Sequence, residues 1–307
     1  MNIQQTLPNL QEASLLLSEL LQDVQKWEGT LAGGTKLGLG ATAIDSLFQT
    51  KVSFGDPHDR LVRLTEETFK ESSAELIDVY QQQMRSQYNF YYLSITVSLI
   101  PKLGAKFRRL TCQLDFSTNH ENNDPIVQTI FPSQKWRDVM NFGAGMALGL
   151  NGNLDWSVGV DESQLEKMRN LLPAELKSNI TNQSEFKAFI AVPTYKYELG
   201  QSEITAVGEG NSVCYWRIQD QELQKIGTVR FVIVFKVPQE IATIKLRGIV
   251  WAEPDMNWLT SDIRDVLGDL GDRFKILLKR KDDAANQFAR GDAEEWILTL
   301  PNTTTSP

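Results

Sequence analysis

The stretch from Asn141 to Val160 constrains this chain most, because apolar side chains alternate along it with glycines and polar residues. The apolar parity holds Phe142, Met146 and Leu148, and after an Asn-Gly-Asn sequence it resumes and includes Trp156. A period of two is typical of strands, and Asn-Gly is a strong signal for a hairpin turn. The pattern therefore predicts a β-hairpin whose apolar face is buried in a core, in a partner or in a membrane.

The same period of two recurs through the middle of the chain. The strands that it predicts are 88–99, 110–117, 126–130, 186–192, a segment near 204, 213–218, 228–237 and 241–251. Segment 228–237 is apolar on both parities, which predicts a central strand covered on both faces. Because the strands follow one another without regular alternation with helices, the sequence predicts an antiparallel β-sandwich.

Apolar spacings of three and four residues dominate the two ends of the chain and predict amphipathic helices there. Asp56 and Pro57 have the residue types that begin a helix, so one is expected to start there and to reach about Ser86. Near the other end, Thr260 or Ser261 is the expected cap. The predicted helices are 10–27, 41–49, 56–86, 161–176, 260–278 and 282–296.

These patterns predict an α+β fold, with a mainly antiparallel β-sandwich core flanked by N-terminal and C-terminal helical segments. Residues 1–86 are expected to form a helical segment with a Gly-rich linker. Residues 87–254 are expected to form the sandwich with one inserted helix, 161–176. Residues 255–307 are expected to hold the C-terminal helices and a loose tail.

Charge and cysteine content narrow the classes of function. The net charge of −8 disfavours nucleic-acid binding, since an acidic chain lacks a diffuse positive field. Two cysteines do not make a disulfide framework in a chain of this size. The N-terminus lacks the pattern of a secretory leader, and there is no apolar run long enough for a spanning helix. A cytoplasmic, acidic protein with reduced thiols is the expectation.

The sequence contains no motif that selects a catalytic, metal or cofactor site. The Gly-rich segment 33–40 follows a predicted helix and lacks the residue order of a phosphate loop. His58 falls in a predicted first helical turn, where the helix dipole disfavours its charged form, and Cys112 falls on an apolar strand face. We expect no cofactor and no metal, and an enzymatic role is disfavoured without being excluded.

The candidate binding residues form two groups. One is the apolar face of the hairpin, represented by Phe142, Met146, Leu148 and Trp156. The other is the short basic cluster Lys106, Arg108 and Arg109 between two predicted strands, which could meet an anionic lipid surface or an acidic patch of a partner.

Three hypotheses of function follow. The leading one is a non-enzymatic interaction or scaffold protein whose sandwich and amphipathic terminal helices bind a protein partner or self-associate. The first alternative is a membrane-active effector of the pore-forming type, in which the hairpin 141–160 inserts into lipid, although packing of the hairpin on the sandwich core is preferred. The second alternative is a hydrolase that uses carboxylates from distant positions.

Overall fold

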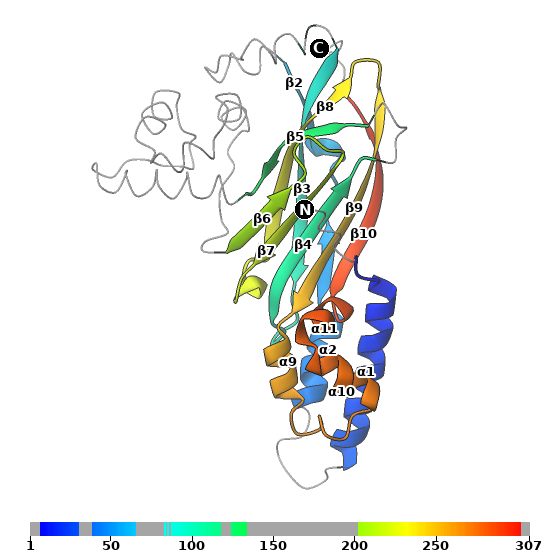
Figure 1. Ribbon diagram of the computed structural model, residues 1–307, viewed down its shortest axis with the longest axis vertical. Helices are drawn as coiled ribbons and strands as arrows, with labels where there is room; N and C mark the ends of the chain where they lie inside the picture. Colours follow the sequence, from blue (N-terminus) through cyan, green and yellow to red (C-terminus); the bar gives the residue numbers. More distant parts are fainter. Residues whose placement is uncertain are drawn as a thin grey trace, which may run out of the picture.

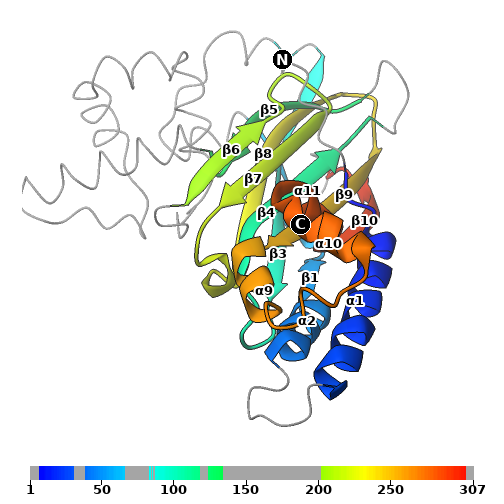
Figure 2. The same ribbon diagram turned by 60° about the horizontal axis from the view of Figure 1, so that its bottom comes forward.

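The computed structural model describes residues 7–30, 39–65, 83, 85, 87–117, 124–133 and 202–301. These residues form two five-stranded antiparallel sheets, with a group of helices beyond one end of them (Figure 1, Figure 2). The predicted fold class, an α+β protein built on an antiparallel β-sandwich with helical segments on both sides of it in the chain, is confirmed. The hairpin predicted at 141–160, the inserted helix at 161–176 and the strand at 186–192 lie outside the described residues.

Sheet A has the strand order β1-β3-β8-β5, with β2 also paired to β3, and sheet B has the order β10-β9-β4-β7-β6. The strands of sheet A are β1 (Lys51–Phe54), β2 (Leu61–Leu64), β3 (Tyr88–Ile100), β5 (Ile126–Phe131) and β8 (Thr228–Pro238). Those of sheet B are β4 (Phe107–Asp115), β6 (Glu203–Val207), β7 (Val213–Gln219), β9 (Thr243–Pro254) and β10 (Arg290–Thr299).

Alternation along each strand sends one parity of side chains into a shared core. On β3 this parity includes Leu93, Ile95 and Val97, which are fully buried. Strand β8 differs, because Val232 and Val234, on the parity opposite to its core residues, are buried as well. The prediction of a central strand covered on both faces is therefore confirmed.

Contacts at two corners connect the sheets. At one corner Phe54, the last residue of β1, donates its backbone N–H to Asp292 of β10 at 3.2 Å, and its ring meets Trp296 edge-on at 5.1 Å between centroids. At the other corner the loop between β6 and β7 reaches β5: Val127 donates its N–H to the carbonyl oxygen of Asn211 at 3.0 Å. Such contacts cover strand edges, which otherwise present unpaired backbone groups.

The helices gather at one end of the sandwich (Figure 1). The apolar side of the first helix is fully buried there, as Leu17, Leu20 and Val24 show, and it belongs to the same cluster as the sandwich core. The apolar faces of the terminal helices are thus used inside the molecule, and only their outer faces can meet a partner. The helices are α1 (Leu10–Thr30), α2 (Leu39–Gln49), α9 (Met256–Asp262), α10 (Asp272–Lys279) and α11 (Lys281–Gln287).

The helix predicted to begin at Asp56 is wrong at its start. Asp56 does cap a turn, since its Oδ1 accepts the N–H of His58 at 3.0 Å, but only the one-turn helix η1 (His58–Arg60) follows. Strand β2 comes next and pairs with β3. Leu61 and Leu64 have helical spacing, but the long neighbouring strand offers a ladder of hydrogen bonds that overrides this local pattern.

The prediction for the C-terminal part is correct only in part. Helix α9 begins at Met256, after the cap Asp255, rather than at Thr260 or Ser261. The helix predicted for 282–296 is wrong beyond α11, because β10 pairs with β9 along its whole length. Strands β1, β2 and β10 thus join the sheets although they lie outside 87–254, and the three-part division of the chain stays a prediction.

Candidate binding surfaces

The basic cluster predicted at Lys106, Arg108 and Arg109 is divided by the structure. Arg109 on β4 lies opposite Glu253 on β9, with 2.8 Å between Nη1 and Oε2. The register of the two strands shifts between Phe107 and Arg109, so that Arg108 is the extra residue of a bulge. Arg109 therefore has an ion-pair partner, whereas Lys106 and Arg108 are exposed.

The turn before β4 carries the most exposed large hydrophobic side chain among the described residues. Leu103 is 93% exposed, and Ile100 at the end of β3 is 58% exposed. Ala105 donates its N–H to the carbonyl oxygen of Lys102 at 3.0 Å, and Gly104 has the positive φ that a type II turn requires. We call residues 100–108 the basic turn, since the exposed Lys102, Lys106 and Arg108 flank this leucine.

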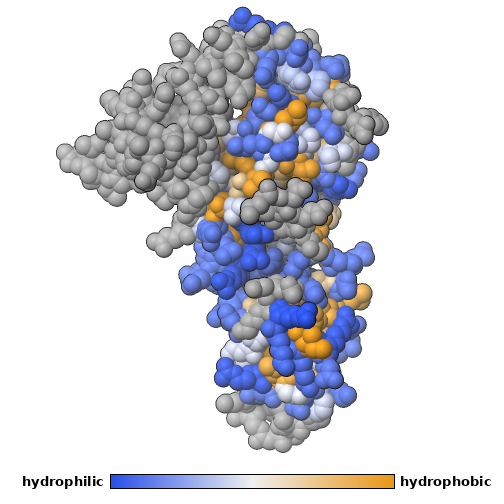
Figure 3. All heavy atoms as spheres, in the orientation of Figure 1, coloured by the Kyte–Doolittle hydropathy of each residue, from blue (hydrophilic) through white to orange (hydrophobic). Residues whose placement is uncertain are grey.

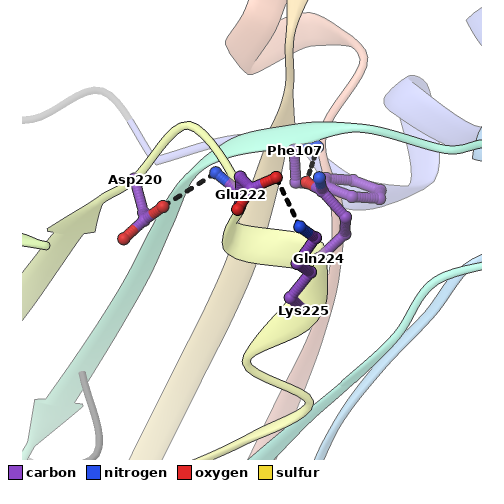
Figure 4. Close-up of polar contacts among 5 residues, drawn as sticks. All are labelled: Phe107, Asp220, Glu222, Gln224 and Lys225. Atoms are coloured by element: carbon purple, nitrogen blue, oxygen red, sulfur yellow. Dashed lines mark hydrogen bonds and ion pairs between the residues drawn. The ribbon is translucent and has the colours of Figure 1, made fainter. Parts of the chain in front are cut away.

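The loop between β7 and β8 lies against the basic turn and contains the one-turn helix η2 (Leu223–Lys225) (Figure 4). Its Gln224 side chain accepts the N–H of Phe107 at 3.3 Å, which ties the loop to the start of β4. The two acidic residues of this loop are already occupied: Asp220 accepts the N–H of Glu222 at 2.7 Å, and Glu222 forms an ion pair with Lys225. Only Glu222 is paired with a cation, so Asp220, whose N–H donates to the carbonyl oxygen of Arg108 at 3.0 Å, leaves one negative charge of this loop beside the basic turn.

A second surface covers the outer sides of α1 and α10, which an ion pair between Glu19 and Arg273 connects at 3.1 Å. On α1, Leu15 is 66% exposed and lies between the exposed carboxylates of Glu12 and Glu19. On α10, Ile276 is 57% exposed and lies among basic residues that include Arg273. Figure 3 shows small hydrophobic patches among hydrophilic residues at this end of the molecule. We call this surface the helical face.

The cysteines have the environment of inert core residues. Cys112 on β4 and Cys214 on β7 are both buried and free, and they lie on the same face of adjacent strands. Burial raises the pKa of the Cys112 thiol, and the neighbouring Cys214 adds to this effect. Burial also raises the pKa of Cys214, with a further contribution from Asp115. Both cysteines are therefore thiols at neutral pH, which agrees with the buried thiol predicted for Cys112.

Of the histidines, His120 lies outside the described residues and His58 is exposed. The imidazole Nδ1 of His58 bonds to the Asp56 carboxylate, and this hydrogen bond raises the pKa of His58. The expectation that a helix dipole disfavours the charged form of His58 is thus wrong, because only a one-turn helix begins here and the hydrogen bond to Asp56 favours the charged form.

Two further properties concern metals and membranes. Within the described ranges, no three side chains of His, Cys, Asp or Glu come close enough together to hold a metal ion. In the same part of the chain, no helix has both the length and the apolar character needed to cross a bilayer.

The hairpin residues Phe142, Met146, Leu148 and Trp156 lie outside the described residues, so their core and membrane interpretations both stay predictions. Conversely, Leu103 and Ile276 were not among the residues predicted from the sequence. For each of these two residues, the sequence contains a feature that agrees with its exposure. Leu103 lies between lysine and glycine in a strand-to-strand turn, and Ile276 lies off the apolar face of its helix.

Comparisons with known proteins assign this chain to no family. No protein-family model and no curated protein matches the chain. Among solved structures, the collagen-binding domain of a Staphylococcus aureus adhesin aligns at 10% identity over 55% of this chain and 77% of that chain, with a TM-score of 0.18. The collagen adhesin of S. aureus aligns at 8% identity over 69% of this chain and 47% of that chain, also with a TM-score of 0.18. Scores this low carry no argument about this chain.

Proposed function

We propose that this chain is a non-enzymatic binding protein that associates with a second copy of itself through the helical face. The observation that carries this proposal is the division of charge on that surface. The exposed side of α1 is acidic around Leu15, and the exposed side of α10 is basic around Ile276. Leu15 thus has a carboxylate on each side, whereas Ile276 lies among Arg273, Lys279 and Arg280, together with Asp272, which is paired with Lys275 at 3.7 Å.

A two-fold axis makes such a surface complementary to itself. In an isologous contact, α1 of one copy meets α10 of the other, and the reverse contact follows by symmetry. The groups needed for this are free: neither Glu12 on α1 nor Lys279 on α10 has a side-chain partner among the described residues. Leu15 and Ile276 would form the dry centre of the contact, and the charges would form its rim.

Sedimentation velocity over a range of concentrations tests the proposal. The wild type is expected to show a reversible monomer–dimer equilibrium, and the variant Leu15→Ser/Ile276→Ser is expected to weaken it about 100-fold, since two apolar side chains lose their burial. The matched control is Val62→Ser/Ile297→Ser, which changes two apolar residues on β2 and β10 that are 49% and 61% exposed. A monomeric wild type, or equal weakening in the control, would contradict the proposal.

A further inference from the structure

We propose that the basic turn is a contact site for an anionic lipid surface, with Leu103 entering the interface between headgroups and acyl chains. The site is separate from the helical face and does not depend on self-association. Two observations support it: the exposure of Leu103, at 93%, and the free cations around it. Interfacial membrane binding uses this combination of an apolar group that enters the lipid and basic groups that stay at the headgroups.

The basic turn is held rigidly in the shape that presents Leu103. The hydroxyl of Ser46 on α2 donates to the carbonyl oxygen of Leu103 at 3.1 Å, and the N–H of Lys102 donates to Thr50 Oγ1 at 3.2 Å. On the other side, the N–H of Asp255 donates to the carbonyl oxygen of Lys106 at 3.0 Å. All three bonds use backbone atoms of the turn, so the side chains stay free, and little conformational entropy is lost when the turn binds.

The cations around Leu103 form no ion pair with a described residue. Lys102, Lys106 and Arg108 are exposed, and none has a side-chain partner among the described residues. Lys51, which lies opposite Ile100 in the ladder of β1 and β3, is a fourth exposed cation.

Two carboxylates, Asp255 and Asp220, lie near these cations and keep their negative charge, because the groups that donate hydrogen bonds to them are neutral. Asp255 caps α9 and accepts the N–H groups of Asn257 and Trp258, at 2.8 and 3.1 Å. Asp220 accepts the hydroxyl of Ser202 and the N–H of Glu222. Glu222 is itself paired with Lys225. The four exposed cations Lys51, Lys102, Lys106 and Arg108 therefore outnumber the carboxylates Asp220 and Asp255, although the whole chain is acidic.

The shape of the site favours lipid over an acidic protein. A stable contact between two proteins buries about 800 Å² on each partner, which requires a broad complementary surface. In the basic turn Leu103 is 93% exposed, Ile100 is the other exposed apolar residue, and nothing lies within 4 Å of where a Cβ on Gly104 would be. A lipid surface can accept one exposed leucine without a preformed pocket, and long lysine side chains keep their ammonium groups at the headgroups while the leucine enters.

Vesicle co-sedimentation of the full chain tests the inference. Vesicles of phosphatidylcholine with phosphatidylserine are expected to bind the wild type at low ionic strength, and vesicles of phosphatidylcholine alone are not. Leu103→Ser is expected to lower the partition coefficient about tenfold or more, because the apolar side chain is lost. Lys106→Gln/Arg108→Gln is expected to lower it about 30-fold, from about 1 kcal/mol for each charge. Leu103→Trp is expected to bind at least as tightly as the wild type.

The controls match each change elsewhere on the molecule. Ile297→Ser removes an exposed apolar side chain from β10, and Arg60→Gln/Arg264→Gln removes two exposed cations. Both controls are expected to bind vesicles as the wild type does. Absence of wild-type binding, or equal loss in the controls, would overturn the inference. Binding to polyglutamate beads that needs Lys106 and Arg108, without binding to vesicles, would also overturn it and would indicate an acidic protein partner.

Discussion

Arg109 and Glu253 face each other across β4 and β9, and their ion pair is buried on the carboxylate side. The Glu253 side chain is 6% exposed and that of Arg109 is 29% exposed. Glu253 Oε1 also accepts a hydrogen bond from Trp251 Nε1 at 3.2 Å. Burial raises the pKa of Glu253, and the charge of Arg109 opposes this rise. Arg109, proposed from the sequence as a binding residue, thus holds the charge of a buried carboxylate.

Removing only one partner of this pair should be costly. Arg109→Met is expected to lower the free energy of unfolding by about 3 kcal/mol, because Glu253 stays buried without its counter-charge. The double variant Arg109→Met/Glu253→Leu is expected to regain most of the loss, since it leaves no buried charge. Urea unfolding at neutral pH measures both variants. Additive losses in the double variant would show that the two residues do not interact.

The charge of Asp115 should make the free energy of unfolding depend on pH in the acidic range. Burial by itself raises the pKa of Asp115, but hydrogen bonds from Ser117 and Arg247 outweigh it and hold the pKa below its ordinary value of 3.8. A lowered pKa stabilises the fold above pH 3.8, and this stabilisation is lost as the pH falls through the lower native value.

The variant Asp115→Asn tests this dependence. It is expected to lower the free energy of unfolding by about 1 kcal/mol at neutral pH, where the carboxylate is charged in both states. The difference from the wild type should shrink as the pH is lowered below 3.8. Unfolding curves across this range would refute the interpretation if the difference grew on acidification.

Gly248 permits the packing at the corner of β1 and β10. A Cβ at this position would lie 2.8 Å from the Trp296 ring and 3.0 Å from the Phe54 ring. Gly248→Ala is therefore expected to destabilise the fold by about 1–3 kcal/mol, because the Trp296 ring is buried in the core and the Phe54 ring packs against it. Gly268→Ala is the control, since nothing lies within 4 Å of its Cβ position. Thermal unfolding should separate the two variants, and equal melting temperatures would contradict this account.

The two cysteines should not react with thiol reagents in the folded protein. Both are buried, and burial raises the pKa of each thiol, so that little thiolate forms. With Ellman's reagent at mildly alkaline pH, the native chain is expected to show no fast-reacting thiol, and guanidinium should expose both cysteines. A fast reaction of either thiol in the native chain would mean that the sheet B core opens readily.

The strand pattern could be predicted where a single period dominates. β3 alternates in sequence from Tyr91 onward, and β8 is apolar on both parities, so each strand was predicted close to its observed bounds. β10 was missed because its first half is charged and its apolar side chains, Trp296 and Leu298, come late. β10 is a strand because it pairs with β9. The two segments are distant in the sequence, so the residues around β10 do not by themselves indicate a strand.

The binding surfaces were harder to predict from the sequence for a similar reason. The position of Lys106 in a turn followed from the strands on either side, whereas Arg108, expected in the same turn, belongs to β4. The pairing of Arg109 with Glu253 joins residues that are 144 positions apart, and the link between α1 and α10 joins Glu19 to a residue 254 positions away. Only the fold brings such groups together, so charge neutralisation could not be judged from the sequence.

Charge exchange on the helical face tests the proposed self-association most directly. The variant Glu12→Lys makes the outer side of α1 less acidic, and Lys279→Glu/Arg280→Glu makes the outer side of α10 acidic. In a two-fold contact, each variant opposes like charges against itself, whereas a mixture of the two restores opposite charges in both contacts. Sedimentation velocity is expected to show each variant alone as a monomer and the mixture as a heterodimer. Monomers in the mixture, or dimers of either variant alone, would contradict the proposal.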